Sequence, residues 1–139
     1  MTGTVDLACF SYLASARILS VDRYPVADTG AEVHGVIHSL AADGPITALT
    51  AADLGLTCAL VANPVGTDPT GTLLLEQFEN AAIRHRLTGR ADRPTPEITV
   101  ITDRHGTRTW LAHLTHAVDD LLTADLTWLT RARAAYIDC

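Results

Sequence analysis

Apolar residues gather in three short runs that lie far apart along the chain, at residues 5–10, 57–62 and 134–139. The runs lack a regular alternation of apolar and polar positions. This is typical of strands that are buried on both faces of a parallel sheet. We therefore expect three parallel strands that form the centre of the fold.

Three segments between these runs carry helical signals. Residues 47–56 are rich in alanine and leucine, and Gly55 suits the C-terminal cap of that helix. Residues 71–87 place apolar side chains three and four positions apart, as on one face of a helix. Residues 117–132 have aspartates near their start and arginines near their end, which the helix dipole favours. Strands that alternate with helices predict an α/β fold, a parallel sheet with flanking helices.

Two further segments do not fit this alternation of strands and helices, and they predict a small β-hairpin lid. Residues 96–111 alternate apolar and polar positions on either side of a four-residue polar turn at 103–106. Residues 31–40 are β-branched and interrupted by glycine, which indicates one or two strands set apart from the main sheet. We expect a single domain over residues 1–139, with lid segments at 31–40 and 96–111.

The composition excludes several kinds of function. The 139 residues carry a formal net charge of −6, and all ten basic residues are arginine. Without lysine there is no P-loop lysine and no Schiff-base lysine. The acidic balance without a basic cluster argues against a nucleic-acid partner, and no apolar run is long enough to span a membrane. Three widely spaced cysteines match no disulfide framework, so we expect a reducing, cytoplasmic location.

Four short motifs follow one another along the chain. They are residues 19–25 (LSVDRYP), 43–48 (DGPITA) followed by Leu54-Gly55, 65–71 (VGTDPTG) and the segment from Thr95-Pro96 to 106–109 (GTRT). Their order and spacing resemble the N-terminal half of the ribokinase-like (PfkB-type) carbohydrate kinases. The resemblance implies a sugar or nucleoside site between the glycine-containing turn and the lid, with ATP held by the C-terminal half.

The resemblance also implies substrate-binding positions, which differ here from the family pattern. The aspartate that binds sugar hydroxyls in the family falls at Ser15 or Ala16, and the Gly-Gly pair falls at residues 41–42 or 43–44. The family's asparagine falls at Ile46 or Ala48. The candidate substrate-binding residues are Ala16, Asp43, Gly44 and Ile46, and the candidate lid residues are Ile98, Val100 and Trp110.

The family's catalytic aspartate lies in a G-A-G-D turn, and these 139 residues contain no G-x-G-D. No catalytic residue is therefore assigned. We expect the chain to bind no cofactor alone, and to meet ATP and Mg²⁺ only when a C-terminal half is supplied.

Two functions of different classes follow from this sequence. The favoured one is the substrate-and-lid half of an ATP-dependent sugar or nucleoside phosphotransferase, inactive alone. The alternative is a non-catalytic binding or dimerisation module that keeps the kinase scaffold. A pocket adapted to unrelated small-molecule chemistry is a third option. The unpaired sheet edge at 134–139 predicts association, either as a homodimer through the lid or with a second chain that covers the edge.

Other polar residues have simpler interpretations. His34 and His38 would lie about 13 Å apart on one face of a strand, too far to share a metal ion, so no metal site is predicted. Asp68 is expected to cap the helix that follows it. Trp128 is expected in the core, whereas Trp110 packs within the lid or covers a ligand or partner.

Overall fold

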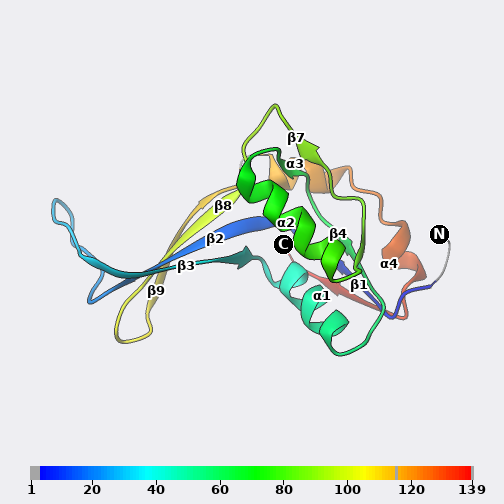
Figure 1. The fold of residues 1–139 in the computed structure, drawn as a ribbon, viewed down its shortest axis with the longest axis horizontal. Helices are drawn as coiled ribbons and strands as arrows, with labels where there is room; N and C mark the ends of the chain where they lie inside the picture. The colour runs from blue at the N-terminus through cyan, green and yellow to red at the C-terminus, as the bar shows by residue number, and fades with distance from the viewer. Residues whose placement is uncertain (1–3, 115, 139) are drawn as a thin grey trace.

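The structure is a computed structural model that describes residues 4–114 and 116–138. It consists of a lobe built around a parallel sheet and a second sheet that extends away from the lobe (Figure 1). We call this second sheet the lid. The arrangement confirms the predicted α/β fold with flanking helices and a β lid.

The sheet of the lobe has the strand order β10–β1–β4–β6, and all its neighbouring strands are parallel. The strands are β1 (Leu7–Phe10), β4 (Cys58–Val61), β6 (Arg84–His85) and β10 (Ala134–Ile137). The three predicted strands are therefore confirmed as β1, β4 and β10; Cys139, the last residue of the third predicted run, lies outside the described residues. β10 lies at the edge of the sheet and is mostly exposed.

Helices pack on both faces of this sheet. Four helices are described: α1 (Asp43–Asp53), α2 (Pro69–Asn80), α3 (Ala117–Leu122) and α4 (Thr127–Arg131). Cys9 and Leu60 belong to one core cluster with Phe78 of α2. Their chain neighbours Ala8 and Ala59 face the other way and pack against Trp128 of α4 and the residue after it, because successive side chains of a strand point to opposite faces.

Both described cysteines are small core residues. Cys9 and Cys58 are buried on neighbouring strands, and burial, together with the nearby Cys58, raises the pKa of the Cys9 thiol to about 11. No helix within the described part of the chain is both long enough and apolar enough to cross a membrane.

The lid is a four-stranded sheet in the order β3–β2–β8–β9. Its strands are β2 (Ala14–Val21), β3 (Val33–Ala41), β8 (Glu97–Thr102) and β9 (Arg108–His113). The outer pairs are antiparallel and the central pair, β2 with β8, is parallel. The predicted hairpin is thus confirmed, while β2 was not predicted. A third, two-stranded sheet pairs β5 (Val65–Gly66) with β7 (Gly89–Arg90) in parallel.

α1 begins four residues earlier than predicted and ends where Gly55 indicates. Gly55 has a φ of 88°, a left-handed conformation that costs glycine little. Its N–H donates to the Ala52 carbonyl at 2.9 Å, and the N–H of Leu56 donates to the Ala51 carbonyl at 3.0 Å. These two bonds form a Schellman motif, which satisfies the last carbonyl groups of the helix.

α2 ends at Asn80, and the prediction that it reaches residue 87 is wrong. Ala82 adopts a left-handed φ of 54°, and its N–H donates to Glu79 at 3.1 Å. The N–H of the buried Ile83 then donates to Phe78 at 3.2 Å. This is the same Schellman motif with alanine in the place of glycine, so no glycine marks the helix end in the sequence.

The predicted helix over residues 117–132 is divided into α3 and α4. The carboxylate of Asp125 accepts a hydrogen bond from the backbone N–H of Thr127 at 2.9 Å, which forms a local turn immediately before α4. Leu122, at the end of α3, is 80% exposed and does not pack against the core. Trp128 and Leu129 do pack against the core, although both remain partly exposed.

Candidate functional site

The carboxyl ends of β1 and β10 meet the N-terminus of α1, and polar side chains gather there. The hydroxyl of Ser11, which follows β1, donates to Oδ2 of Asp138, which follows β10, at 3.1 Å. The same oxygen accepts the backbone N–H of Asp43 at 3.2 Å. The Asp138 carboxylate is thus held in one position by groups from two other elements.

Gly44 allows α1 to approach this cluster closely. A Cβ atom added to Gly44 would lie 2.4 Å from Cβ of the buried Ser11, which is far inside van der Waals contact. The sequence therefore requires glycine at this position so that the first turn of α1 can reach the Asp138 carboxylate. Gly44 positions the helix and does not itself face open space.

A cleft of about 670 Å³ lies between this cluster and the lid. We call the part formed by Tyr12, Ala42, Asp43 and Asp138 the floor, and the inner face of the lid the wall. The residues of β2, β8 and β9 that form the wall are Ala16, Ile18, Ile98, Val100, Arg108 and Trp110. Ligand sites for drug-sized molecules have volumes of about 300–1000 Å³, so the cleft has the size of a ligand site.

The strand register explains why these wall residues share one face. Ile18 pairs with Ile37 on β3 and with Val100 on β8, and Val100 pairs with Trp110 on β9. Side chains at paired positions point to the same face of a sheet. One apolar row therefore crosses the inner face of the lid, from Ile37 to Trp110.

The floor is acidic, and this acts on the neighbouring tyrosine. Partial burial, with smaller contributions from the carboxylates of Asp138 and Asp43, raises the pKa of the Tyr12 hydroxyl. Tyr12 therefore keeps its proton at neutral pH and can donate a hydrogen bond into the cleft. The two carboxylates beside it are acceptors. The floor thus offers both kinds of hydrogen-bond partner.

The structure brings five of the seven candidate residues to this cleft. Ala16, Asp43, Ile98, Val100 and Trp110 all line it. Of the other two, Gly44 lies behind the floor, and Ile46 is 45% exposed on α1 and does not line the cleft.

Sequence reasoning did not single out Ser11 as part of this site, nor Tyr12, Arg108 and Asp138. A usable signal existed for two of them. Ser11 directly follows the predicted strand at 5–10, and Asp138 is the charged residue near the C-terminal end of the predicted strand at 134–139; ligands of α/β proteins bind at the carboxyl ends of such strands.

Asp68, in the G-x-D-x-x-G motif, has a structural role. It caps α2 as predicted, since its Oδ1 accepts the N–H of Gly71 at 2.9 Å. It also accepts the N–H of Thr95 at 2.8 Å and the Thr95 hydroxyl, and that hydroxyl accepts the N–H of Gly66 at 3.1 Å. The motif therefore ties the segment that enters β8 to the start of α2.

The histidines gather no metal site in the described residues. His34 and His38 lie on one strand, as predicted, and His34 is 3.5 Å from the Asp22 carboxylate. No group of three or more His, Cys, Asp or Glu side chains that could hold a metal ion occurs in residues 4–114 and 116–138.

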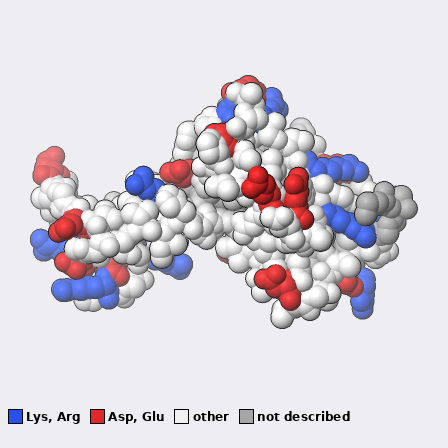
Figure 2. Space-filling model, viewed as in Figure 1, with Lys and Arg blue, Asp and Glu red and all other residues white. Residues whose placement is uncertain are grey.

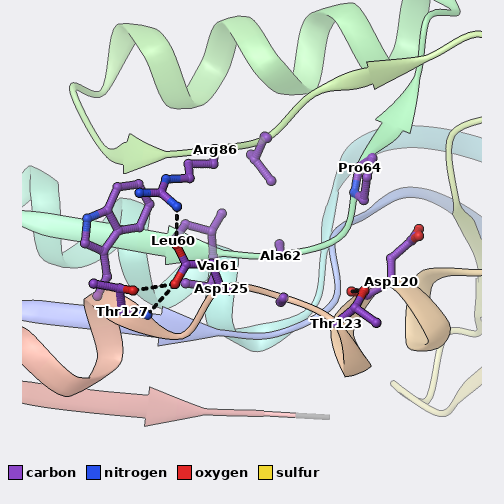
Figure 3. Close-up of a pocket in the computed structure, with 12 residues that line it drawn as sticks. Leu60, Val61, Ala62, Pro64, Arg86, Asp120, Thr123, Asp125 and Thr127 are labelled. Carbon is purple, nitrogen blue, oxygen red and sulfur yellow. Dashed lines mark hydrogen bonds and ion pairs between the residues drawn. The ribbon is translucent and has the colours of Figure 1, made fainter.

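A smaller pocket of about 210 Å³ lies beside β4, and Figure 3 shows its lining. Arg86 forms an ion pair with Asp125, and its guanidinium lies 5.4 Å from the centroid of the Trp128 ring. Asp125 also accepts hydrogen bonds from the backbone and hydroxyl of Thr127. These polar groups bond to one another across the pocket, so they connect α4 to the segment after β6.

Solved structures show what this fold resembles. Ribokinase from Giardia lamblia is similar over 100% of this chain and 42% of its own, with a TM-score of 0.78 and 14% sequence identity. A putative ribokinase from Agrobacterium tumefaciens matches 98% of this chain and 45% of its own, with a TM-score of 0.75 and 18% identity. A nucleoside kinase from Methanocaldococcus jannaschii, an archaeal member of the ribokinase family, matches 81% of this chain and 38% of its own, with a TM-score of 0.65 and 17% identity.

These comparisons confirm the fold, which is ribokinase-like. The chain spans between about a third and a half of the length of the solved structures that it matches. The sequence itself matches no protein-family model and no curated protein.

Proposed function

We propose that this chain, with its ribokinase-like fold, forms the substrate-and-lid half of an ATP-dependent sugar or nucleoside kinase. The observation that carries the proposal is the cleft between the lid and the carboxyl ends of β1 and β10. Its floor holds two carboxylates, and charged acceptors form strong hydrogen bonds with hydroxyl groups. Similar solved structures include a ribokinase and a nucleoside kinase, which supports this substrate class.

In this proposal the floor residues bind different groups of the substrate. Asp138 accepts hydrogen bonds from substrate hydroxyls, and Ser11 and the N-terminus of α1 keep its carboxylate in place. Tyr12 donates to a substrate oxygen. The lid lies over the bound molecule and excludes water, which strengthens each of these polar interactions.

The floor does not suit the phosphates of ATP. The N–H of Asp43, at the start of α1, already donates to the Asp138 carboxylate, and both carboxylates repel an anion. We therefore assign ATP and Mg²⁺ to a complementary half, joined to this chain or supplied by a second one, and no phosphoryl-transfer step to these residues. The 139-residue chain alone is expected to bind substrate without turning it over.

The test is a calorimetric titration of the full chain with a panel of sugars and nucleosides, followed by a phosphotransfer assay with ATP. At least one compound should bind, and Asp138→Asn should weaken it about tenfold, since hydrogen bonds to charged groups contribute about 1.5–3 kcal/mol. Asp53→Asn, an exposed aspartate at the end of α1, is the control and should bind normally. Absence of any binding would overturn the proposal, and ATP turnover by the chain alone would overturn the assignment of ATP to another half.

A non-catalytic binding or dimerisation module is the second candidate, and the outer face of the lid favours it. This face carries the paired residues Val36, Leu19 and Ile101, together with Leu111. Val36 is 46% exposed and Leu111 is 61% exposed, because α2 lies only against the base of this face. A second copy of the chain would remove these apolar side chains from water. The edge strand β10 offers a second position, where another polypeptide could pair.

A further inference from the structure

The two sides of the cleft differ sharply in chemistry. The floor has the Asp43 and Asp138 carboxylates and the Tyr12 hydroxyl, whereas the middle of the wall is entirely apolar. Trp110 is 63% exposed there, and it continues the row formed by Ile18 and Val100. Figure 2 shows charged side chains both at the far end of the lid and over the lobe.

The hydroxyls of a free sugar find hydrogen-bond partners on the floor of this cleft but none on the apolar row of the wall. Hydroxyls turned toward that row would lose water without gaining a partner. Each buried, unpartnered hydroxyl reduces affinity, because the desolvation of a polar group is uncompensated there. The cleft volume of about 670 Å³ also lies in the middle of the range for drug-sized ligands. The wall therefore favours a second, apolar portion of the substrate.

The shape of that apolar portion follows from the residues of the wall. The indole of Trp110 offers a flat aromatic surface, and aromatic rings stack on one another with a gain beyond the area that they bury. Ile18 and Val100 extend this surface across two neighbouring strands, without a hydrogen-bonding side chain between them. Arg108, one row further toward the tip, is the nearest charged wall residue on β9.

A second copy of the chain is a poorer occupant of this face. An apolar protein surface pressed against the wall would also cover the acidic floor, and two carboxylates would lose water without compensation. The outer face of the lid has no such floor. A small molecule with one polar and one apolar end meets both surfaces without this cost.

We propose that the substrate of this site is a sugar that carries a flat apolar group, as nucleosides and aryl glycosides do, with its hydroxyls on the floor and its ring beneath Trp110. The inference rests on the proposed function and deepens it. Trp110 is then the residue that determines specificity, because it distinguishes the substituted sugar from the free one.

The experiment compares matched pairs of ligands: ribose with adenosine and uridine, and glucose with phenyl glucoside. Trp128→Phe leaves Trp110 as the single tryptophan, so its fluorescence reports contact with the ring. Calorimetry gives each dissociation constant. We expect at least one ring-bearing ligand to bind about tenfold or more tightly than its free sugar and to change Trp110 fluorescence.

Two variants make the test specific. Trp110→Ala should weaken the ring-bearing ligand about tenfold and leave the free sugar unchanged, a difference that a general structural defect would not produce. Leu111→Ala is the control, because Leu111 neighbours Trp110 on β9 but points to the outer face. It should leave both affinities as they were.

The outcomes separate this inference from the proposed function. If free sugars bind as tightly as their ring-bearing partners and Asp138→Asn weakens both, the inference fails while the proposed function stands. If no ligand binds, both fail. If Trp110 fluorescence responds to protein concentration and not to ligand, a second copy covers the wall and the inference is overturned.

Discussion

Among single residues, Asp68 makes the most connections at the base of the lid. Its carboxylate receives hydrogen bonds from Gly71 and from both the backbone and the hydroxyl of Thr95. Gly66 and Gly71 must be glycine for this packing. A Cβ at Gly66 would lie 2.3 Å from the Asp68 carboxylate, and one at Gly71 would lie 2.1 Å from the Gly66 carbonyl oxygen.

Asp68→Ala is therefore expected to destabilise the fold by about 1–3 kcal/mol, because the buried Thr95 hydroxyl and N–H lose their acceptor. Urea unfolding gives the free energy of unfolding. Glu76→Ala, an exposed acidic residue of the same helix, is the control and should change it little. Equal stability of Asp68→Ala and the native chain would show that the network contributes nothing.

Asp6 gives the fold a specific dependence on pH. The Thr57 hydroxyl, the Thr57 N–H and Arg133 donate to its carboxylate, and in that order they lower its pKa from 3.8 to about 2. These bonds connect the starts of β1, β4 and β10. Since the folded state holds the carboxylate more acidic than the unfolded state does, its stabilising contribution is complete above about pH 4 and disappears as the pH falls toward 2.

Asp6→Asn should therefore lower the free energy of unfolding at pH 7 and make its decline between pH 4 and pH 2 shallower. Urea titrations at several pH values measure both effects. Asp53→Asn should keep the decline of the native chain. A decline that is as steep in Asp6→Asn as in the native chain would rule Asp6 out as its source.

Among the elements, α1 and α2 end in the same motif with different residues. Gly55 takes the left-handed position after α1, and Ala82 takes it after α2. The left-handed conformation is less favourable for alanine than for glycine, because the Cβ of alanine lies too close to the backbone there.

Ala82→Gly should thus stabilise the protein by about 1 kcal/mol, and thermal unfolding should show a higher Tm. Ala81→Gly is the matched control: Ala81 has an ordinary φ of −78°, so glycine there should lower stability. Destabilisation by Ala82→Gly would contradict the interpretation of the helix end.

The elements also show what the sequence could and could not predict. The strands β1 and β4 were predictable because each is a short apolar run with no competing pattern. β2 was not, because its sequence ASARILSV mixes small, charged and apolar residues, and its pairing with β8 depends on residues far along the chain. The end of α2 was missed because Ala82 carries no signal for a left-handed turn.

Prediction of the candidate site was also limited by contacts between residues that lie far apart in the sequence. Asp43 could be placed from its local motif, but Asp138 joins it only through the order of strands in the sheet, which puts β10 beside β1. The apolar row of the wall likewise depends on the register of four strands. Neither feature is local in sequence.

For the whole molecule, the uncovered outer face of the lid predicts self-association. Val36→Arg combined with Leu111→Arg would put two charges into a contact between copies, so it should shift a dimer to the monomer without reducing affinity in the cleft. Sedimentation velocity at several protein concentrations measures this. Ile46→Arg, which alters an exposed apolar residue on α1, should leave association unchanged. A native chain that stays monomeric at all concentrations would contradict the prediction.

The parallel pairing of β2 with β8 has a consequence for how the chain folds. The β2–β3 and β8–β9 hairpins each close locally, but Ser15 meets Pro96 and Glu97 only after the intervening lobe has brought them together. Closing so long a loop costs entropy that local contacts do not repay. The β2–β8 pairing should therefore form last, when the two preformed hairpins come together after the lobe has folded.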